Sequence, residues 1–342
     1  MGAQAGGGNA VKVLISGAFW HGSLEESYAR AFESIGWNVA RFDWERHQND
    51  HPLAGMALTN KLLRSKIANR TGKWLNTAIQ DAQPDLVLVV KGKMISPPTL
   101  IAIKQTLSDR PLVNFNPDSP WEPANSSRRL LESISVYDIH FTWSKQLLPK
   151  FIDAGAKKAE YLPFAYDPVL HQPLKGDLPP IQYDAIFVGT YSPERDLVLS
   201  SLEGCNIRIV GNGWKKAKYV PKDWILSEAV YGEDAVRVLA LGACSVNLLR
   251  PQNRHSHNMR TFEIPATANA MLTTRSEEQA QWFQEGFEME CFATPEELLS
   301  KIKMLAGDPH HSRMIANNGY ETVREETYAK RTRAMTSLLG FS

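Results

Sequence analysis

The sequence contains little cysteine and no excess of charge of either sign. Its 342 residues include only Cys205, Cys244 and Cys291, which are far apart and lie in apolar segments. Three isolated cysteines argue against a disulfide framework or a zinc site and favour buried thiols in a reducing cytoplasm. The 38 Lys and Arg residues nearly balance the 37 Asp and Glu residues. We therefore expect no general nucleic-acid binding, although a local anion pocket is compatible with this balance.

Long hydrophobic runs are absent as well. The longest clean apolar runs, such as LVLVV at residues 86–90, are far too short to span a bilayer. The glycine-rich residues 1–10 lack the apolar core of a signal peptide and are predicted to be a flexible leader. The expected protein is cytoplasmic and has no transmembrane segment, while a peripheral contact with a membrane stays open.

Strand and helix patterns alternate along the chain. VKVLISG at residues 11–17 is typical of a buried strand that ends in glycine, and a helical pattern and a second strand follow it. A segment with four prolines, residues 167–182, interrupts the alternation, which then restarts with DAIFVGT at residues 184–190. This order predicts an α/β fold with two parallel sheets. The predicted domains are residues 11–166 and 183–320, with a linker at 167–182 and a final helix in 321–342.

Ligands of open parallel sheets bind at the carboxyl ends of the strands, so the loops that follow the strands are the candidate sites. Gly189 ends one strand and leads into a helix that carries Arg195 in its first turn. A cation is unfavourable there, which suggests an anionic partner; a tight turn with a surface arginine is the alternative. Gly211 lies in the Gly-Asn-Gly turn of the next strand end, where backbone could approach a nucleotide.

The densest basic segment is LLRPQNRHSHNMR, residues 248–260, which follows another predicted strand. It contains Arg250, Arg254 and Arg260 together with His255 and His257, and it contains no acidic residue. Guanidinium groups suit phosphate recognition, although a solvated basic loop has the same composition. The His-x-His pair has no carboxylate or cysteine nearby in the sequence, so we predict no metal site.

Thr261 and Glu263 open the small-residue helix that follows this basic segment. Thr261 is suited to cap the helix, and a carboxylate in the first turn is stabilised by the helix dipole. That stabilisation alone would account for Glu263. The functional alternative is that its carboxylate accepts hydrogen bonds from the two hydroxyls of a ribose.

Several of these motifs together resemble the GT-B glycosyltransferases. The motifs are YDAIFVGTYSPERDLVLSSL, IRIVGNGW, NMRTFEIPATANAMLTT and NNGYETVREETYAKRTRAM, preceded by NFNPDSPW. Their order and spacing are most similar to the branch of spore maturation protein CgeB and the group 1 glycosyl transferases. The resemblance covers roughly residues 85–340. It implies two Rossmann-like domains that face a central cleft, with a final helix that crosses back to the N-terminal domain.

The resemblance also implies the roles of individual residues. Gly189 and Thr190 would offer backbone N–H groups to the diphosphate of a nucleotide sugar, and Arg195 takes the place of a lysine found in many relatives. Glu263 matches the carboxylate that binds the ribose. The residues expected along the rest of the donor are Gly211, Tyr231 near the base, Arg250, Asn258, Arg260 and Thr261. Such enzymes generally need no cofactor and no divalent metal, and this chain has no Asp-x-Asp motif.

Two positions depart from the family pattern. His255 stands eight residues before Glu263, where many retaining relatives have a second glutamate. Thr190 stands where an arginine often follows the loop glycine. These differences leave the donor and the stereochemical outcome open, and an arginine of the basic segment could supply the missing positive charge.

Two residues after strands of the first domain are candidates for orienting an acceptor hydroxyl. His21 follows the first predicted strand, and Asp118 follows NFNP. Either could position or deprotonate a hydroxyl group. The alternatives are an ordinary loop histidine and an aspartate that caps the turn before Pro120.

The predicted function is a hexosyltransferase-like transfer of sugar from a nucleotide-diphosphate sugar to an acceptor hydroxyl, without metal and with retention. The acceptor, whether glycan, small molecule or protein, stays open. Two alternatives use the same fold: a non-catalytic assembly or binding protein, and a sugar-nucleotide epimerase or hydrolase. The second alternative requires further acid and base residues around the sugar, which the sequence does not identify.

Overall fold

The computed structural model describes residues 10–49 and 61–341, which fall into two compact units. The first unit comprises residues 1–163 and 331–342, and the second comprises residues 164–330. Of the leader predicted at residues 1–10, all but Ala10 lies outside the described residues. None of the described helices is both long and apolar enough to cross a membrane.

The first unit is built on a six-stranded parallel sheet with the order β2-β1-β3-β4-β5-β6. The strands are β1 (Lys12–Gly17), β2 (Asn38–Asp43), β3 (Leu86–Val90), β4 (Leu112–Asn116), β5 (Ile139–Thr142) and β6 (Ala159–Tyr161). Every residue of β3 and β4 is buried, as expected for central strands that helices cover on both faces. The short apolar run LVLVV therefore marks the middle of this sheet.

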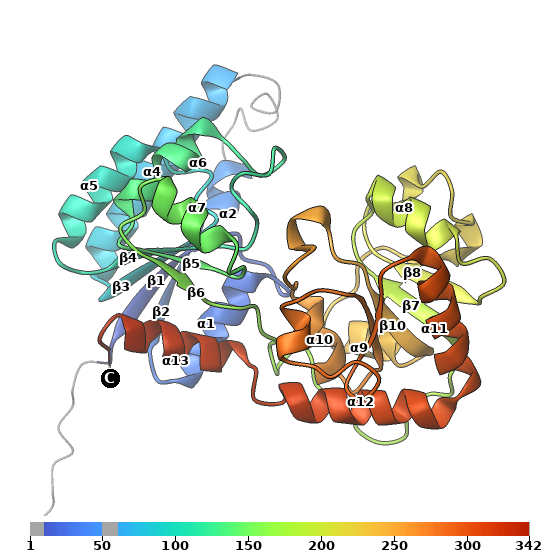
Figure 1. Ribbon diagram of the computed structural model, residues 1–342. Helices are drawn as coiled ribbons and strands as arrows, with labels where there is room; N and C mark the ends of the chain where they lie inside the picture. The colour runs from blue at the N-terminus through green and yellow to red at the C-terminus, as the bar shows by residue number, and fades with distance from the viewer. Residues whose placement is uncertain (1–9, 50–60, 342) are drawn as a thin grey trace, which may run out of the picture. The chain divides into compact units, whose positions relative to one another are not determined.

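Helices cover both faces of this sheet (Figure 1). They are α1 (Leu24–Ser34), α2 (Trp44–Asn49), α4 (Lys61–Ala82), α5 (Pro97–Leu107), α6 (Arg128–Glu132), α7 (Leu147–Asp153) and α13 (Tyr328–Leu338), with a short turn η1 (Ile134–Val136). On one face, Leu75 and Ile79 of α4 and Ile103 of α5 pack with Val87 and Val89 of β3. On the other face lie α1 and α13.

The second unit has a six-stranded parallel sheet with the order β12-β11-β10-β7-β8-β9. The strands are β7 (Tyr183–Val188), β8 (Ile207–Val210), β9 (Ile225–Ser227), β10 (Gly242–Asn247), β11 (Met271–Thr274) and β12 (Glu290–Phe292). The chain starts at β7 and builds outward in one direction to β9, then returns to build from β10 in the other. The point where the order reverses therefore lies between β7 and β10, where open α/β sheets bind their ligands.

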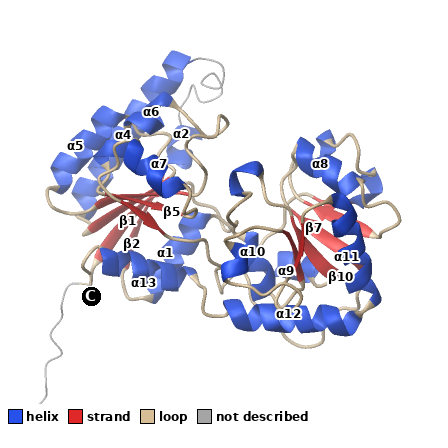
Figure 2. Ribbon diagram, in the orientation of Figure 1, coloured by secondary structure: helices blue, strands red, loops and turns tan. Residues whose placement is uncertain are grey.

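Helices also cover this second sheet on both faces, as Figure 2 shows. They are α8 (Pro193–Ser200), α9 (Glu233–Leu239), α10 (Arg260–Ala266), α11 (Pro295–Gly307) and α12 (Pro309–Val323). The short turns are η2 (Trp214–Lys216), η3 (Lys222–Trp224), η4 (Pro251–Asn253) and η5 (Gln279–Gln281). Leu199 of α8 and Leu298 and Ile302 of α11 belong to the main core of the unit. Leu239 of α9 packs on the opposite face against Ile186 and Val210.

The boundary between the units differs from the one predicted from the sequence. The second unit begins at Phe164, so it takes in residues 167–182, which were predicted to be a linker. That segment has no helix or strand, yet Leu170 and His171 are buried within the unit. The N–H of Tyr166 donates to the carbonyl of Glu326, and the N–H of Tyr328 donates to the carbonyl of Tyr166. At the other end, residues 331–342 belong to the first unit.

Candidate functional site

The loops after β7 and β10 meet at the switch point of the second unit, and Arg195 joins them. Its guanidinium donates to the carbonyl of Thr190, at 2.8 Å, and to the carbonyl of Leu248, at 3.0 Å. Thr190 follows β7, and Leu248 follows β10. The same group lies over the ring of Phe187, 5.3 Å from its centroid. Arg195 is thus held in place by backbone and by an aromatic face.

Positive charge accumulates around Arg195. Burial lowers the pKa of its guanidinium to about 10, and the charges of Arg250 and Arg260 act in the same direction. At neutral pH the group is still a cation. Within residues 10–49 and 61–341, no carboxylate forms an ion pair with Arg195, and its guanidinium donates only to the two carbonyls. Three cations without enough counter-charge favour an anion at this edge of the sheet.

Packing between two loops explains Gly189 and Gly211, and the sequence prediction did not include this role. The N–H of Gly189 donates to the carbonyl of Val210 at 2.9 Å, so it is not available to a diphosphate as predicted. Gly211 lies directly against this residue, because a Cβ at position 211 would be 2.1 Å from the Gly189 oxygen. Gly211 therefore supports the loop from behind. For the N–H of Thr190, the described part of the chain gives no partner.

The first turn of α8 satisfies its own donors. The hydroxyl of Ser192 accepts from the N–H of Arg195 at 3.3 Å. The pKa of Glu194 is lowered first by its own backbone N–H and then by the Ser192 hydroxyl. The helix N-terminus, which the sequence suggested as an anion site, is therefore capped by the protein itself.

Asn258 and Thr261 hold α10 against β10. The amides of Asn247 and Asn258 form a reciprocal pair with distances of 3.1 and 2.8 Å, and the Asn258 oxygen accepts from the Thr261 N–H at 3.1 Å. Thr261 is fully buried, and its hydroxyl donates to Gln279 Oε1 at 3.0 Å. Its predicted contact with a diphosphate does not agree with this burial. The structural contribution of both residues is to position Arg260 and Glu263.

Glu263 lies on the first turn of α10 with its carboxylate between two basic side chains. Its Oε2 accepts from Arg260 Nη1 at 2.8 Å, and its Oε1 lies 3.9 Å from Nε2 of His171. Only 7% of the Glu263 side chain is exposed. His171 was missed in the sequence because it lies in the proline-rich segment predicted to be a linker. A histidine there has no periodic pattern that would mark it as a site residue.

Three other residues of the predicted site are exposed. Arg250 and Tyr231 are exposed, Tyr231 just before α9. His255 is exposed too and lines a shallow pocket of about 390 Å³ that Arg254, Arg275, Ser276, Glu277 and Ala280 complete. The pocket around His255 does not include Glu263, so His255 is not placed as a second carboxylate would be in the family pattern.

His257 belongs to the interior of the unit and not to a basic surface. It is fully buried, its Nδ1 lies 3.0 Å from Glu278 Oε2, and its Nε2 accepts from the N–H of Phe164 at 3.1 Å. Both ring nitrogens thus have protein partners. In the described part of the chain, no group of three or more His, Cys, Asp or Glu side chains is arranged to hold a metal ion.

In the first unit, three loops at the carboxyl edge of the sheet are linked by charged side chains. Lys91, directly after β3, lies 3.5 Å from the carboxylate of Asp118, which follows β4. Glu25 is buried under the loop after β1, and its Oε1 accepts from the N–H of Ala18 at 3.2 Å. Burial raises the pKa of Glu25, and the charge of Lys91 opposes that rise. Glu25 and Lys91 were not identified from the sequence.

The two acceptor candidates differ in how firmly they are held. Asp118 is half-buried, and its N–H donates to Asn116 Oδ1 at 3.2 Å. His21 is exposed on the loop after β1, where its carbonyl accepts from Arg30 at 3.5 Å. Both residues follow strands at the carboxyl edge of the sheet. For His21, however, the described residues make no side-chain contact that distinguishes it from an ordinary loop histidine.

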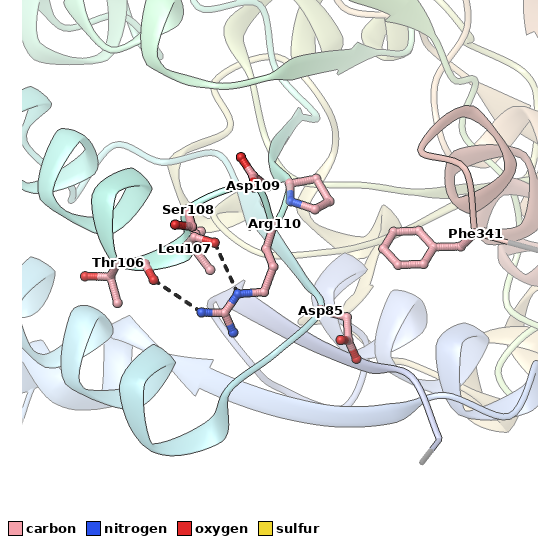
Figure 3. A pocket seen from close by; sticks show the side chains of 8 residues that line it. Asp85, Thr106, Leu107, Ser108, Asp109, Arg110 and Phe341 are labelled. Carbon is pink, nitrogen blue, oxygen red and sulfur yellow. Dashed lines mark hydrogen bonds between the residues drawn. The ribbon is translucent and has the colours of Figure 1, made fainter. Parts of the chain in front are cut away.

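A pocket of about 570 Å³ lies at the opposite edge of the first sheet (Figure 3). Asp85 precedes β3 and Pro111 precedes β4, so the pocket is at the amino ends of the strands. Arg110 lies in it and donates to the carbonyls of Leu107 and Thr106, each at 3.2 Å. Parallel sheets bind ligands at their carboxyl ends, so we do not assign this pocket to the site.

The comparisons with known proteins agree with this geometry. Residues 195–337 match the family described as "Glycosyl transferase-like". Among curated proteins, none matches the sequence.

Solved structures match almost the whole chain. Sucrose-phosphate synthase from Thermosynechococcus elongatus is 12% identical with a TM-score of 0.68, covering 96% of this chain and 99% of that one. HepE from Anabaena, solved with UDP and glucose, is 12% identical with a TM-score of 0.63 and the same coverage. A trehalose-6-phosphate synthase, studied for glycosyl transfer with retention, is 13% identical with a TM-score of 0.58, covering 96% and 98%. The chain therefore has the GT-B fold of these glycosyltransferases, with two Rossmann-like α/β units.

Proposed function

We propose that the chain is a glycosyltransferase that moves a sugar from a nucleotide-diphosphate sugar to an acceptor hydroxyl. The observation that carries the proposal is the group formed by Arg195, Arg250, Arg260 and Glu263 at the switch point of the second sheet. It combines an excess of positive charge with a carboxylate that Arg260 holds in place. Similar structures were solved with UDP-glucose, in HepE, and with UDP-2-fluoro glucose, which supports a nucleotide sugar as the ligand.

In this proposal the arginines bind the diphosphate and Glu263 binds the ribose. The field of Arg195, Arg250 and Arg260 attracts the diphosphate, and the N–H of Thr190 donates to it. Glu263 Oε1 accepts from the ribose diol, since Oε2 is already held by Arg260. The base lies toward Tyr231. Gly189, Gly211, Asn258 and Thr261 shape the backbone and do not contact the ligand in this scheme.

The chemical step breaks the bond between the anomeric carbon and the diphosphate oxygen and forms a bond from that carbon to the acceptor oxygen. Negative charge grows on the departing diphosphate, and fixed guanidinium groups stabilise it without reorganisation. We propose that this charge replaces a divalent metal. The trehalose-6-phosphate synthase studied for transfer with retention supports a retaining outcome. No enzyme nucleophile is then required, and the acceptor proton leaves to the diphosphate or to a base.

For the acceptor side we propose Asp118, with His21 as the second candidate. Asp118 is fixed by Lys91 and by its own turn, so it has the geometry to orient a hydroxyl. We further propose that the chain belongs to the CgeB-like branch, on the order and spacing of its motifs. The three buried, unpaired cysteines support an enzyme that acts in the cytoplasm.

Nucleotide binding tests the donor site directly. UDP-, GDP- and dTDP-sugars are added to the intact protein, and thermal stability and nucleoside diphosphate release are measured. Glu263→Ala is expected to weaken binding by tenfold to a hundredfold, because about 1.5–3 kcal/mol of charge-assisted hydrogen bonding is lost. Glu321→Ala is the matched control, since Glu321 is exposed and pairs only with Arg324 on the surface.

The outcomes separate the candidate functions. A donor that is consumed only with an acceptor supports the transferase. A donor that is hydrolysed or epimerised without an acceptor supports the alternative enzymes, and nucleotide binding without turnover of any donor supports a binding protein. If no nucleotide stabilises the protein at saturating concentration, the proposed donor site is wrong, because a ligand that binds the native state must raise its stability.

A further inference from the structure

The two oxygens of the Glu263 carboxylate have different surroundings. Oε2 accepts from Arg260 Nη1 at 2.8 Å. Oε1 faces His171 Nε2 at 3.9 Å, which is too long for a direct hydrogen bond. The oxygen that Arg260 does not hold is therefore the one that faces the imidazole.

The backbone that carries His171 is held in a turn by hydrogen bonds. The N–H of His171 donates to the carbonyl of Asp167 at 2.8 Å, and the Asp167 carboxylate accepts from the N–H of Val169 at 2.9 Å. Asp167 is 2% exposed and His171 is 9% exposed. The imidazole is therefore a buried side chain that projects from a hydrogen-bonded turn.

The surroundings also select one protonation state of the ring. Nδ1 is buried and has no hydrogen-bond partner among the described residues, whereas Nε2 faces a carboxylate. A buried N–H without an acceptor is costly, so the proton of the neutral ring resides on Nε2. Burial lowers the pKa of His171, with Arg260 acting in the same direction and Glu263 and Asp167 opposing it. The ring is thus a neutral donor that points toward Glu263.

The two atoms are spaced so that one hydroxyl oxygen beside them could contact both. An oxygen about 2.8 Å from each of two atoms 3.9 Å apart makes hydrogen bonds that meet at roughly 90°. We propose that His171 and Glu263 together bind one ribose hydroxyl, which donates to Glu263 Oε1 and accepts from the His171 Nε2–H. This rests on the proposed function, and it makes His171 a specificity residue for ribonucleotide over deoxyribonucleotide donors.

The arrangement demands a group that both donates and accepts. A hydrogen atom in place of the hydroxyl would leave a carboxylate oxygen and an imidazole N–H facing each other across an unfilled gap. Sites built to bond a hydroxyl discriminate strongly against analogues that lack it, because their own buried polar groups then stay unpaired. Without the ribose hydroxyl, a carboxylate alone would lose one hydrogen bond, whereas Glu263 and His171 together would lose two.

Binding of UDP, 2′-deoxy-UDP and 3′-deoxy-UDP to the intact protein tests the proposal by calorimetry. The wild type is expected to bind one of the deoxy analogues at least tenfold more weakly than UDP. His171→Phe keeps the ring shape but removes the donor, so it should weaken UDP about tenfold and remove most of this discrimination. His171→Gln, which can return an N–H, should restore most of both. His310→Gln is the control, because His310 is an exposed histidine of the same unit.

Failure of this inference is distinct from failure of the proposed function. If the wild type binds UDP but accepts both deoxy analogues equally, or if a folded His171→Phe variant discriminates as the wild type does, His171 has no part in ribose recognition. If UDP, GDP and dTDP all fail to bind the wild type, the donor site itself is wrong.

A spectroscopic measurement covers the case in which the phenylalanine variant does not fold. The side-chain ¹⁵N spectrum of the wild type should show the Nε2–H form of His171. Its Nε2 signal should move with UDP and not with the weaker deoxy analogue. A proton on Nδ1, or identical shifts with all three ligands, would overturn the proposal.

Discussion

Arg195→Met is the substitution that best separates binding of the diphosphate from stability of the fold. The methionine has a similar length but none of the five donors of arginine. Two hydrogen bonds are lost, to the exposed Thr190 loop and to the half-buried Leu248 carbonyl. Hydrogen bonds to charged groups contribute about 1.5–3 kcal/mol each, and exposure puts the Thr190 bond at or below the lower end.

Part of this loss is offset by relief of electrostatic cost. Burial and the neighbouring arginines lower the pKa of Arg195 from its ordinary value to about 10. At about 1.36 kcal/mol for each pH unit, the folded protein holds this charge at a cost of about 3 kcal/mol. The two effects have similar size and opposite sign. The free energy of unfolding without ligand should therefore change by no more than about 2 kcal/mol.

Ligand binding should respond much more strongly than stability. A diphosphate relieves the repulsion among the arginines, so removal of one of them should weaken UDP by tenfold to about a hundredfold. Uridine, which has no phosphate, should change by less than about threefold. The measurement is calorimetric titration of both ligands at two salt concentrations, since screening should weaken UDP binding to the wild type more than to the variant.

UDP and uridine together distinguish a phosphate contact of Arg195 from a structural role. Equal losses for UDP and uridine would mean that Arg195 only shapes the loops after β7 and β10. Arg195→Lys provides a further check, because lysine keeps the charge but cannot bond two carbonyls with one planar group. It should retain more UDP affinity than the methionine variant while losing part of the loop contacts.

Two further predictions concern stability. Burial lowers the pKa of His140 in β5 from 6.5 to about 4. As the pH drops, the unfolded chain therefore takes up a proton before the folded protein does. The free energy of unfolding should fall by about 3 kcal/mol between pH 6.5 and pH 4. Urea unfolding across that range should show this loss, and His140→Gln should remove it; an unchanged pH dependence would contradict the assignment. Gly211→Ala should destabilise the protein by at least about 2 kcal/mol in urea unfolding, because its Cβ would overlap the Gly189 carbonyl. The control is Gly204→Ala, because Gly204 also has a positive φ (82°) but a Cβ there would meet no atom within 4 Å. A similar loss of stability in both variants would show that backbone strain and not the overlap is responsible.

The fold was accessible from the sequence because buried parallel strands are continuous apolar runs. LVLVV is fully buried in β3, as its composition indicates. LVNFN is fully buried in β4 although it includes Asn114 and Asn116. The short edge strand β9, Ile225–Ser227, was missed because three residues carry no period. The linker prediction at 167–182 followed from its prolines. Proline prevents regular structure but not packing, and Leu170 and His171 are buried there.

The site was harder to predict from the sequence because its contacts join residues that are far apart along the chain. Arg195 and Glu263 belong to motifs that a family pattern contains, and each lies in a recognisable turn of helix. His171 and Glu263 are 92 positions apart in the sequence, and no local signal links them. The family resemblance assigned the N–H of Gly189 to a diphosphate, whereas in the structure this N–H continues the hydrogen bonding to β8 for one more residue.

The self-capped first turn of α8 has a consequence for how this protein can evolve. A phosphate site made of main-chain N–H groups survives most substitutions, because every residue supplies the same backbone. Here Ser192 and Glu194 occupy those donors, so in the proposed donor site the side chains of Arg195, Arg250 and Arg260 hold the diphosphate together with the N–H of Thr190. We expect single codon changes at the arginines to weaken donor binding and to leave both sheets intact. Among relatives, loss of the arginines with retention of the glycines would identify chains that keep the architecture after the chemistry is gone.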